Sequence, residues 1–396
     1  MPSPEGRVVQ ELFMPTRSRW SVLNVSFLLG TLAVAAVLVP VKVALQGIHW
    51  SEIVLCTAMV FAIGTAISAG YHRLFSHRAF QATWPVRFLL LCFGAASFEN
   101  SALKWASDHR LHHQYVDTEK DPYTIQKGFW YAHWVWVMEE KEGGLPGVAD
   151  LQKDPLVMWQ HRHHFLIGAV VACIPLYIGL ITGHFWAYLV MGLSLRIVLT
   201  HHTTFLINSA AHMFGSRPYT DANTARDNWV LAPLTYGEGY HNFHHMWQWD
   251  YRNGVRWYQW DTTKWLLSVL SWMGLVTKLR RVSAAAMRRA RLQMEEKQLR
   301  ERLNTASPAV ATPLQERLAA ARLRVDAALA SFQEKCEAWE AKKAEWKAMG
   351  HAKAEQWRLA KAEWKATMAQ HRLELRAAWE EWRAARMEVR TALVYA

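Results

Sequence analysis

Cysteine is scarce in this sequence. Only four of the 396 residues are cysteine, and they lie far apart, at Cys56, Cys92, Cys173 and Cys336. Three of the four fall in apolar stretches, where a free cysteine packs like a small hydrophobic side chain. The sequence therefore excludes a small secreted domain held together by disulfide bonds.

Charged side chains are nearly absent from four long stretches. These are 21–45, with one lysine; 51–70, with one glutamate; 165–181, with none; and 185–207, with one arginine. A helix needs roughly 17–25 apolar residues to cross a bilayer core. Helices buried in a soluble protein rarely lack a polar face over several turns. We therefore predict an all-α integral membrane protein whose four transmembrane helices form two hairpins.

Lysine and arginine gather on one side of these predicted helices. The short connections within the hairpins, QGIHWSE and TGH, contain neither residue, whereas the segments outside the hairpins are rich in both. The positive-inside rule then places both termini, including the N-terminal segment 1–20, in the cytoplasm. We expect a multi-pass protein of the inner membrane if the chain is bacterial, or of the endoplasmic reticulum membrane if it is eukaryotic.

The composition changes abruptly after residue 282. The segment 283–396 is rich in alanine, arginine, glutamate and tryptophan, and it repeats KAEWKA at 343–348 and 361–366. Eighteen residues make five turns of an α-helix, so one stripe should hold most of its tryptophans. These are Trp339, Trp346, Trp357, Trp364 and Trp382. We predict a long, coiled-coil-like helical tail behind a membrane domain, 21–282, that carries a cytoplasmic helical cap.

Two roles are open for this tail. Self-association or pairing with a partner along the tryptophan seam is favoured over binding of its basic faces and tryptophans to an anionic membrane surface. Neither role gives the tail any chemistry, and no nucleic-acid partner is expected.

Three histidine clusters lie at or near the predicted cytoplasmic membrane boundary. They read HRLFSH, HRLHH and HNFHH, and they contain His72, His77, His109, His112, His113, His241, His244 and His245. Positions i, i+3 and i+4 share one face of a helix, so each H-x-x-H-H points three imidazoles the same way. Neutral imidazole binds zinc, copper, iron and nickel. Eight such ligands are too many for one ion, so we predict a site for two metals.

Two residues of NSAAH extend this ligand set. His212 would be a ninth ligand, and Asn208, one turn before it, would hold a metal-bound water. Neutral ligands leave the charge of two divalent ions uncompensated, so either acidic groups lie nearby or a hydroxide bridges the metals. The candidates are Asp108, Asp117, Asp121 and Glu238. Glu238 and His241 form a single E-x-x-H pair without companion glutamates, which disfavours a soluble carboxylate di-iron bundle.

HRLFSH, DHRLHHQYVDTEKDPY, NSAAH and GEGYHNFHH, in this order and separated by hydrophobic hairpins, resemble the integral-membrane acyl-CoA desaturases. The resemblance is to the stearoyl-CoA Δ9 type in its bacterial branch. It covers about residues 15–282, and RPY at 217–219 together with the stretch 250–265 matches the bacterial pattern. The tail lies outside it.

The resemblance implies a di-iron enzyme that uses O2 and two electrons to insert a cis double bond, at Δ9, into a saturated acyl thioester. The implied iron ligands are the nine histidines, with Asn208 bound through water. Asn100, Trp105 and Asp108 would contact the substrate near its thioester. Cys56 and Val60 would select the chain length, and Asp117, Asp121 and Glu238 would support the ligands.

Some positions depart from the family pattern. Glu139, Glu140 and Glu142 stand where the animal enzymes have basic residues, and Ser107 replaces a usual arginine. The acyl carrier therefore stays open between coenzyme A, acyl carrier protein and a membrane lipid. No HPGG motif of a fused cytochrome b5 is found. A separate ferredoxin-, rubredoxin- or cytochrome b5-type donor with its reductase is expected to dock on the basic face.

Other functions compete with this one. An acyl-lipid desaturase or a membrane di-iron fatty acid hydroxylase would use similar histidines. A histidine-rich membrane metal-binding protein or transporter is the alternative from a different class, but it would place ionisable residues inside the membrane spans. A scaffold with an inactive core is disfavoured, because all nine ligand positions are intact.

Overall fold

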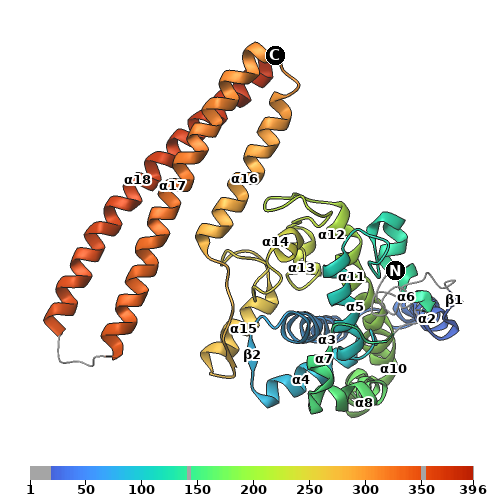
Figure 1. Cartoon of the computed structure of the whole chain (residues 1–396). Helices are drawn as coiled ribbons and strands as arrows, with labels where there is room; N and C mark the ends of the chain where they lie inside the picture. The colour runs from blue at the N-terminus through green and yellow to red at the C-terminus, as the bar shows by residue number, and fades with distance from the viewer. Residues whose placement is uncertain (1–18, 141–143, 349–353, 396) are drawn as a thin grey trace, which may run out of the picture. The chain divides into compact units, whose positions relative to one another are not determined.

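The computed structural model describes residues 19–140, 144–348 and 354–395. Most of the predicted N-terminal segment, as well as Glu142, lies outside the described residues. The chain forms two compact units, which are Met1–Arg217 with Asp221–Arg281, and Pro218–Thr220 with Val282–Ala396 (Figure 1).

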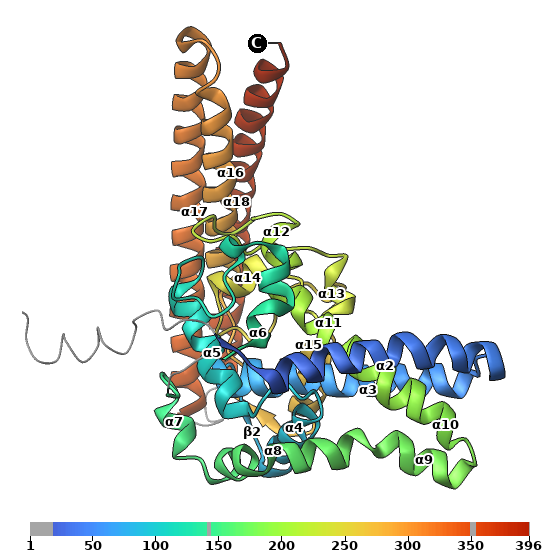
Figure 2. The same cartoon turned by 90° about the vertical axis from the view of Figure 1, so that its right-hand side faces the viewer.

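Four helices of the first unit are long and apolar enough to span a membrane. Within the described residues they are Val22–Gln46, Trp50–Ser76, Pro155–Thr182 and Phe185–Met213. These spans confirm the predicted all-α membrane fold with two hairpins, whose helices lie side by side in Figure 2. The third span begins ten residues earlier than expected, because Asp154 caps the amides of Leu156 and Val157 and Pro155 occupies the first helical position.

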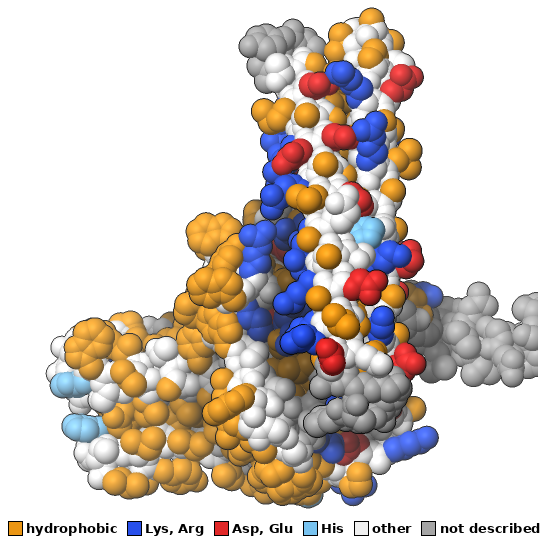
Figure 3. Space-filling view, turned by 90° about the vertical axis from the view of Figure 1, so that its left-hand side faces the viewer, with side chains coloured by type: hydrophobic (Ala, Val, Ile, Leu, Met, Phe, Trp, Pro, Cys, Tyr) orange, Lys and Arg blue, Asp and Glu red, His pale blue; other side chains and the backbone are white. Residues whose placement is uncertain are grey.

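The spans are built from consecutive helical segments. The first hairpin contains α2 (Val22–Gln46), α3 (Trp50–Ala66) and the π-helical segment η1 (Ile67–Ser76). The second contains α8 (Pro155–Ala172), α9 (Ile174–Thr182), α10 (Phe185–Ala187), the π-helical η4 (Tyr188–Leu195), α11 (Arg196–Asn208) and α12 (Ala210–Met213). Hydrophobic side chains cover much of the surface of this unit, as expected for contact with lipid (Figure 3).

Shorter elements form the cap over one end of the spans. They are α4 (Trp84–Ala95), α5 (Ala102–Tyr115), η2 (Ile125–Lys127), η3 (Tyr131–Val135), α6 (Trp136–Met138), α7 (Ala149–Gln152), α13 (Leu231–Leu234), α14 (His241–Met246) and α15 (Thr262–Trp272). Two antiparallel strand pairs join β1 (Arg19–Trp20) to β3 (Glu139–Glu140) and β2 (Gln81–Ala82) to β4 (Val276–Thr277). The main core packs α4, α5, η1 and α8 around Tyr71, Leu91 and Leu103.

The π-helical winding of η1 explains the five-residue spacing of the first histidine pair. The amide of His77 donates to the carbonyl of His72 at 3.1 Å, which is an i to i−5 bond. In an α-helix, side chains five residues apart point in clearly different directions. One π-helical turn instead brings the two rings within 4.8 Å, centroid to centroid.

The second unit consists of helices, as the period of its sequence predicts. Its described residues form three helices, α16 (Ala284–Leu303), α17 (Pro308–Ala348) and α18 (Ala354–Tyr395). The predicted long helical tail is present, and its two longest helices, α17 and α18, run antiparallel and pack against each other (Figure 1). Two ion pairs set their register, Arg317 with Glu388 and Arg324 with Glu381, both at 2.6 Å.

The tryptophan stripe is used inside the chain. The Trp339 ring stacks on those of Trp364 and Trp357, at 4.7 and 5.2 Å, and Trp346 contacts Trp357 at 5.7 Å. Trp382 is buried separately, and its Nε1 donates to Glu295 of α16 at 3.2 Å. The seam predicted for pairing is therefore filled by the fold of this unit itself.

Candidate metal centre and acyl cavity

All nine predicted histidines come together, in two groups. One group contains His72, His77, His109, His113 and His244, and the other contains His112, His212, His241 and His245. Within each group the possible ligand atoms lie within 4.8 Å of one another. The sequence predicted the convergence but gave no division between two ions, and the structure supplies a division into five and four.

Helices α5 and α14 each serve both groups. On α5, His109 and His113 face the first group, while His112 faces the second. On α14, His244 faces the first group, and His241 with His245 faces the second. Each H-x-x-H-H pattern therefore directs ligands from one helix toward both groups. Together, α5 and α14 position six of the nine rings.

The imidazoles meet through their Nε2 atoms. In the first group these atoms are 2.8 Å apart for His77–His109, 3.0 Å for His72–His244 and 2.9 Å for His113–His244. In the second they are 3.1 Å apart for His212–His241, 3.1 Å for His241–His245 and 3.3 Å for His112–His245. Two nitrogens bound at right angles to one ion at about 2.1 Å would lie about 3.0 Å apart. The donor set therefore fits a metal ion in each group.

Burial keeps most of these imidazoles neutral. Loss of hydration, and then the neighbouring histidines, hold the pKa values of His77, His109, His113, His244 and His245 well below the usual range. Burial also lowers the pKa of His241 to about 3. A neutral imidazole with a free lone pair is the form that binds a metal ion.

Polar groups lie behind several of the rings, at Nδ1. Asp121 Oδ1 is 2.9 Å from His112 Nδ1, and the Tyr123 hydroxyl is 3.0 Å from His109 Nδ1. A bond from Nδ1–H to such an acceptor fixes the ring and leaves Nε2 free for a metal. Sequence reasoning missed Tyr123, although it is the last residue of the motif DHRLHHQYVDTEKDPY.

Asp117 reaches a third ring through a hydroxyl. Its carboxylate accepts bonds from the Thr224 amide at 2.7 Å and from Thr224 Oγ1 at 2.6 Å. The same Oγ1 is 2.8 Å from Nδ1 of His212. Thr224 thus links Asp117 to a ring of the second group.

Glu238 carries a buried negative charge beside the first group. Its Oε2 is 3.2 Å from His72 Nδ1, and its carboxylate accepts from Ser68 at 2.5 Å, from Arg73 at 2.9 Å and from Asn253 at 2.5 Å. Burial alone would raise the pKa of Glu238, but His72 and Arg73 hold it well below its usual range. Sequence reasoning gave Arg73 no role at the site, yet its guanidinium is buried and also bonds Asp261.

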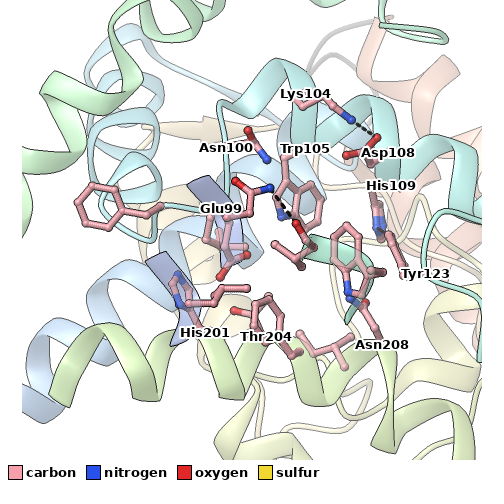
Figure 4. Close-up of a pocket in the computed structure, with 18 of the residues that line it drawn as sticks. Glu99, Asn100, Lys104, Trp105, Asp108, His109, Tyr123, His201, Thr204 and Asn208 are labelled. Atoms are coloured by element: carbon pink, nitrogen blue, oxygen red, sulfur yellow. Dashed lines mark hydrogen bonds and ion pairs between the residues drawn. The ribbon is translucent and has the colours of Figure 1, made fainter. Parts of the chain in front are cut away.

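A cavity of about 510 Å³ lies beside the histidines, with His72, His109 and His241 in its wall. Asn100, Trp105 and Asp108 line it as well, and the Trp105 ring stacks on His109 at 4.8 Å (Figure 4). Asn208, the last residue of α11, also faces the cavity. Most of the remaining wall is apolar or aromatic, as a site for an acyl chain requires.

Cys56 and Val60 have a different position from the one expected. Both are described and buried, but neither is among the residues that line the cavity. They pack against Tyr236, which does line it. A direct contact with substrate is therefore not available to these two side chains while Tyr236 keeps this position.

The polar end of the cavity carries both signs of charge. Lys104 pairs with Asp108 at 2.5 Å, and Glu139 accepts a bond from the Tyr131 hydroxyl at 2.9 Å. Glu140 lines the cavity next to Glu139. Ser107 is buried and donates to the carbonyl of Pro146 at 2.8 Å, so it does not replace the missing arginine at this end.

Glu99 is an acid that sequence reasoning missed. It lines the cavity, and its Oε1 is buried without a hydrogen-bond partner among the described residues (Figure 4). Burial raises the pKa of Glu99 to about 8, although bonds from Thr204 and Trp105 act in the opposite direction. The side chain is therefore a neutral acid at pH 7.

This neutral acid gives a pH-dependent prediction. As the pH rises through about 8, Glu99 ionises and places a charge in an apolar cavity, so the KM for an acyl substrate should rise. Glu99→Gln has the shape of the protonated acid but cannot ionise, so its KM should stay flat across the same range. The measurement is KM against pH for both proteins, and an equal rise in both would contradict the assignment.

Comparison with known proteins agrees with this site. The fatty acid desaturase family matches residues 48–279. The chain is 41% identical over 289 residues to the probable acyl-CoA desaturase of Schizosaccharomyces pombe, covering 69% of this chain and 60% of that protein. It is 40% identical over 260 residues to acyl-CoA desaturase 1 of Saccharomyces cerevisiae, covering 63% and 50%.

A third relative is named for a different substrate, a lipid. The sn-1 stearoyl-lipid 9-desaturase of Anabaena variabilis is 35% identical over 221 residues, covering 55% of this chain and 79% of that protein.

The chain spans only about half to three fifths of the length of the two yeast proteins. The family match includes more than half of the chain and every histidine of both groups. The chain therefore belongs to the fatty acid desaturase family.

Proposed function

We propose that the protein is a fatty acyl desaturase that inserts a cis double bond, at Δ9, into a saturated acyl thioester. The proposal rests on one observation: two groups of histidines, with converging Nε2 atoms, lie in the wall of an apolar cavity. Two metals beside a buried hydrocarbon site suit oxidation of an unactivated chain, which requires an oxidant held close to defined carbons.

The metals are proposed to be two iron ions. The nine histidines would hold them, and Asn208 would contact one through water. When bound, iron would supply the activation of O2 that removes one hydrogen from each of two adjacent methylenes; with two electrons from the donor and two protons from solvent, the oxygen leaves as two waters.

The protein positions the chain and keeps water out. Trp105, stacked on His109, places an aromatic wall beside the first histidine group. Asn100 and Asp108 lie at the polar end of the cavity, where they would contact the thioester portion of the substrate. Asp121, Asp117 and Glu238 would fix the rings through their Nδ1 side and balance the metal charge.

Acyl-CoA is the proposed carrier, because both yeast relatives are named acyl-CoA desaturases. Glu139 and Glu140 at the polar end weaken the case for binding the phosphates of coenzyme A. Acyl carrier protein or a membrane lipid, as in the name of the Anabaena relative, is the alternative. Purified enzyme supplied in turn with the same chain on each carrier distinguishes them.

Further partners and the membrane are proposed on sequence grounds. A ferredoxin-, rubredoxin- or cytochrome b5-type protein with its reductase would supply electrons to the basic cytoplasmic face. The excess of lysine and arginine outside the hairpins places both termini in the cytoplasm, with the bacterial inner membrane or the endoplasmic reticulum as the host membrane. Self-association of the C-terminal unit would use side chains left exposed by its own packing, among them Leu323, Leu359 and Leu373.

Expression in a host that lacks its own desaturase tests the function. Mass spectrometry of the lipids should show products lighter by two hydrogens, with the double bond at Δ9. Products heavier by one oxygen would instead establish a hydroxylase. Intact, metal-loaded protein that yields neither product, with an electron donor present, would contradict the proposal.

A further inference from the structure

The cavity follows one face of the second membrane span away from the histidines. His72, Ser68, Ile67 and Gly64 all line it, and these residues succeed one another toward the interior of the span. The next positions on the same face lie four and eight residues before Gly64, at Val60 and Cys56. Neither of these lines the cavity, so along this face of the span the cavity ends at Gly64.

The ring of Tyr236 forms this end. A Cβ atom placed on Gly64 would lie 1.8 Å from Cζ of Tyr236, so the phenol lies directly against the helix backbone there. The ring is 2% exposed and packs edge-on to Phe61 at 5.7 Å. Its hydroxyl is 2.9 Å from Oγ1 of Thr203.

Apolar side chains occupy the space behind the ring. Cys56, Val60 and Tyr236 form one buried cluster, with Phe61 and Leu195 packed against it. From Gly64 to Cys56 the helix rises about 12 Å, at about 1.5 Å per residue. Tyr236 therefore separates the cavity from a further, mainly apolar region that continues in the same direction, with the buried Arg196 near Cys56.

The backbone at Tyr236 has an unusual conformation. Its φ is 58°, in the left-handed region, where residues other than glycine are uncommon. Such a conformation is strained and persists only where the surroundings enforce it. Here Gly64 leaves room for the ring, and Thr203 contacts its hydroxyl.

We propose that Tyr236, lodged against Gly64, closes the blind end of the acyl cavity and sets the longest chain that the enzyme accepts. Val60 and Cys56 then act behind it, and they contact substrate only when the ring is removed. This inference rests on the proposed desaturase function. The role of Tyr236 concerns chain length alone, because the proposed metal site would act on carbons nearer the polar end of the cavity.

Tyr236→Gly is the direct test, since glycine removes the ring and also adopts a positive φ without strain. The enzyme is offered a mixture of saturated acyl chains, each two methylenes longer than the last. Burial of two extra methylenes is worth roughly a factor of ten. The ratio of the longer to the shorter desaturated product should therefore rise roughly tenfold, with the double-bond position counted from the thioester unchanged.

Two matched variants separate ring volume from other effects. Tyr236→Phe keeps the ring and loses only the hydroxyl, so it should keep the short-chain preference. In the Tyr236→Gly background, Val60→Trp should fill the opened space and restore that preference.

A reciprocal pair of variants tests the contact between Gly64 and Tyr236 itself. Gly64→Ala alone should lower the amount of folded protein, and Gly64→Ala with Tyr236→Gly should recover it.

The outcomes distinguish a failure of the proposed role of Tyr236 from a failure of the proposed desaturase function. If the unaltered protein makes no double bond, the proposed function fails. If it makes one and Tyr236→Gly, with unchanged metal content, gives the same chain-length profile, the role of Tyr236 is wrong. Should Tyr236→Gly not accumulate, Tyr236→Leu, which keeps apolar volume but no ring, is judged by the same profile.

Discussion

Replacing His244 by alanine is expected to abolish product formation and to reduce bound iron from two ions to about one per chain. His244 Nε2 contacts two other rings of the first group, His72 at 3.0 Å and His113 at 2.9 Å. Its loss removes a central donor from one ion and leaves the four histidines of the second group intact. Both ions are needed for the proposed oxidation, so activity should fall to background.

His112→Ala is the matched variant for the other ion. It removes a donor from the second group only, so it should also abolish activity and leave about one ion. His49→Ala is the control, because His49 lies at the opposite end of the first hairpin and outside both groups. Iron content and product are measured on the same preparations. Substantial product from His244→Ala or His112→Ala would refute the ligand assignment.

Glu238→Ala is expected to lower the free energy of unfolding by about 3 kcal/mol or more, the largest loss among the proposed substitutions. The carboxylate is 2% exposed and accepts from Ser68, Arg73 and Asn253. Its removal leaves the buried Arg73 guanidinium with Asp261 and the Tyr251 carbonyl as partners, and it also leaves the Asn253 amide unsatisfied. Removing one member of a buried ion pair costs more than the pair itself contributes.

The apparent Tm in detergent measures this effect. Glu238→Gln should lose less, because its amide oxygen still accepts from Arg73 or Ser68. Glu140→Ala is the control, since Glu140 is exposed and an exposed carboxylate contributes little to stability. A Tm for Glu238→Ala equal to that of the Glu140→Ala control would contradict the supporting role of this network.

The spans and the histidine convergence were predictable because their signals are local. A long uncharged stretch has few alternatives to a membrane helix, and the spacing of His109, His112 and His113 is itself a helical face. The assignment of His112 to a different group from its neighbour His113 was not predictable. It depends on where α14 and α12 lie relative to α5, which no spacing along one helix reveals.

Two other features depend on contacts between distant residues. The repeat in the C-terminal segment predicts helix, but KAEWKA suits a continuous helix and a folded-back pair equally well, so the reversal between α17 and α18 was not predictable. Likewise Tyr236 has no recognisable motif. Its position at the end of the cavity appears only when the chain brings it against Gly64.

The widened winding of η1 makes the backbone itself a determinant of metal affinity. His72 and His77 converge because one π-helical turn separates them. The length of this segment and the histidine spacing are therefore coupled: an insertion or deletion of one residue would move one ring away unless the winding changed with it. We therefore expect a one-residue insertion or deletion in this segment to be tolerated only when the spacing and the winding change together.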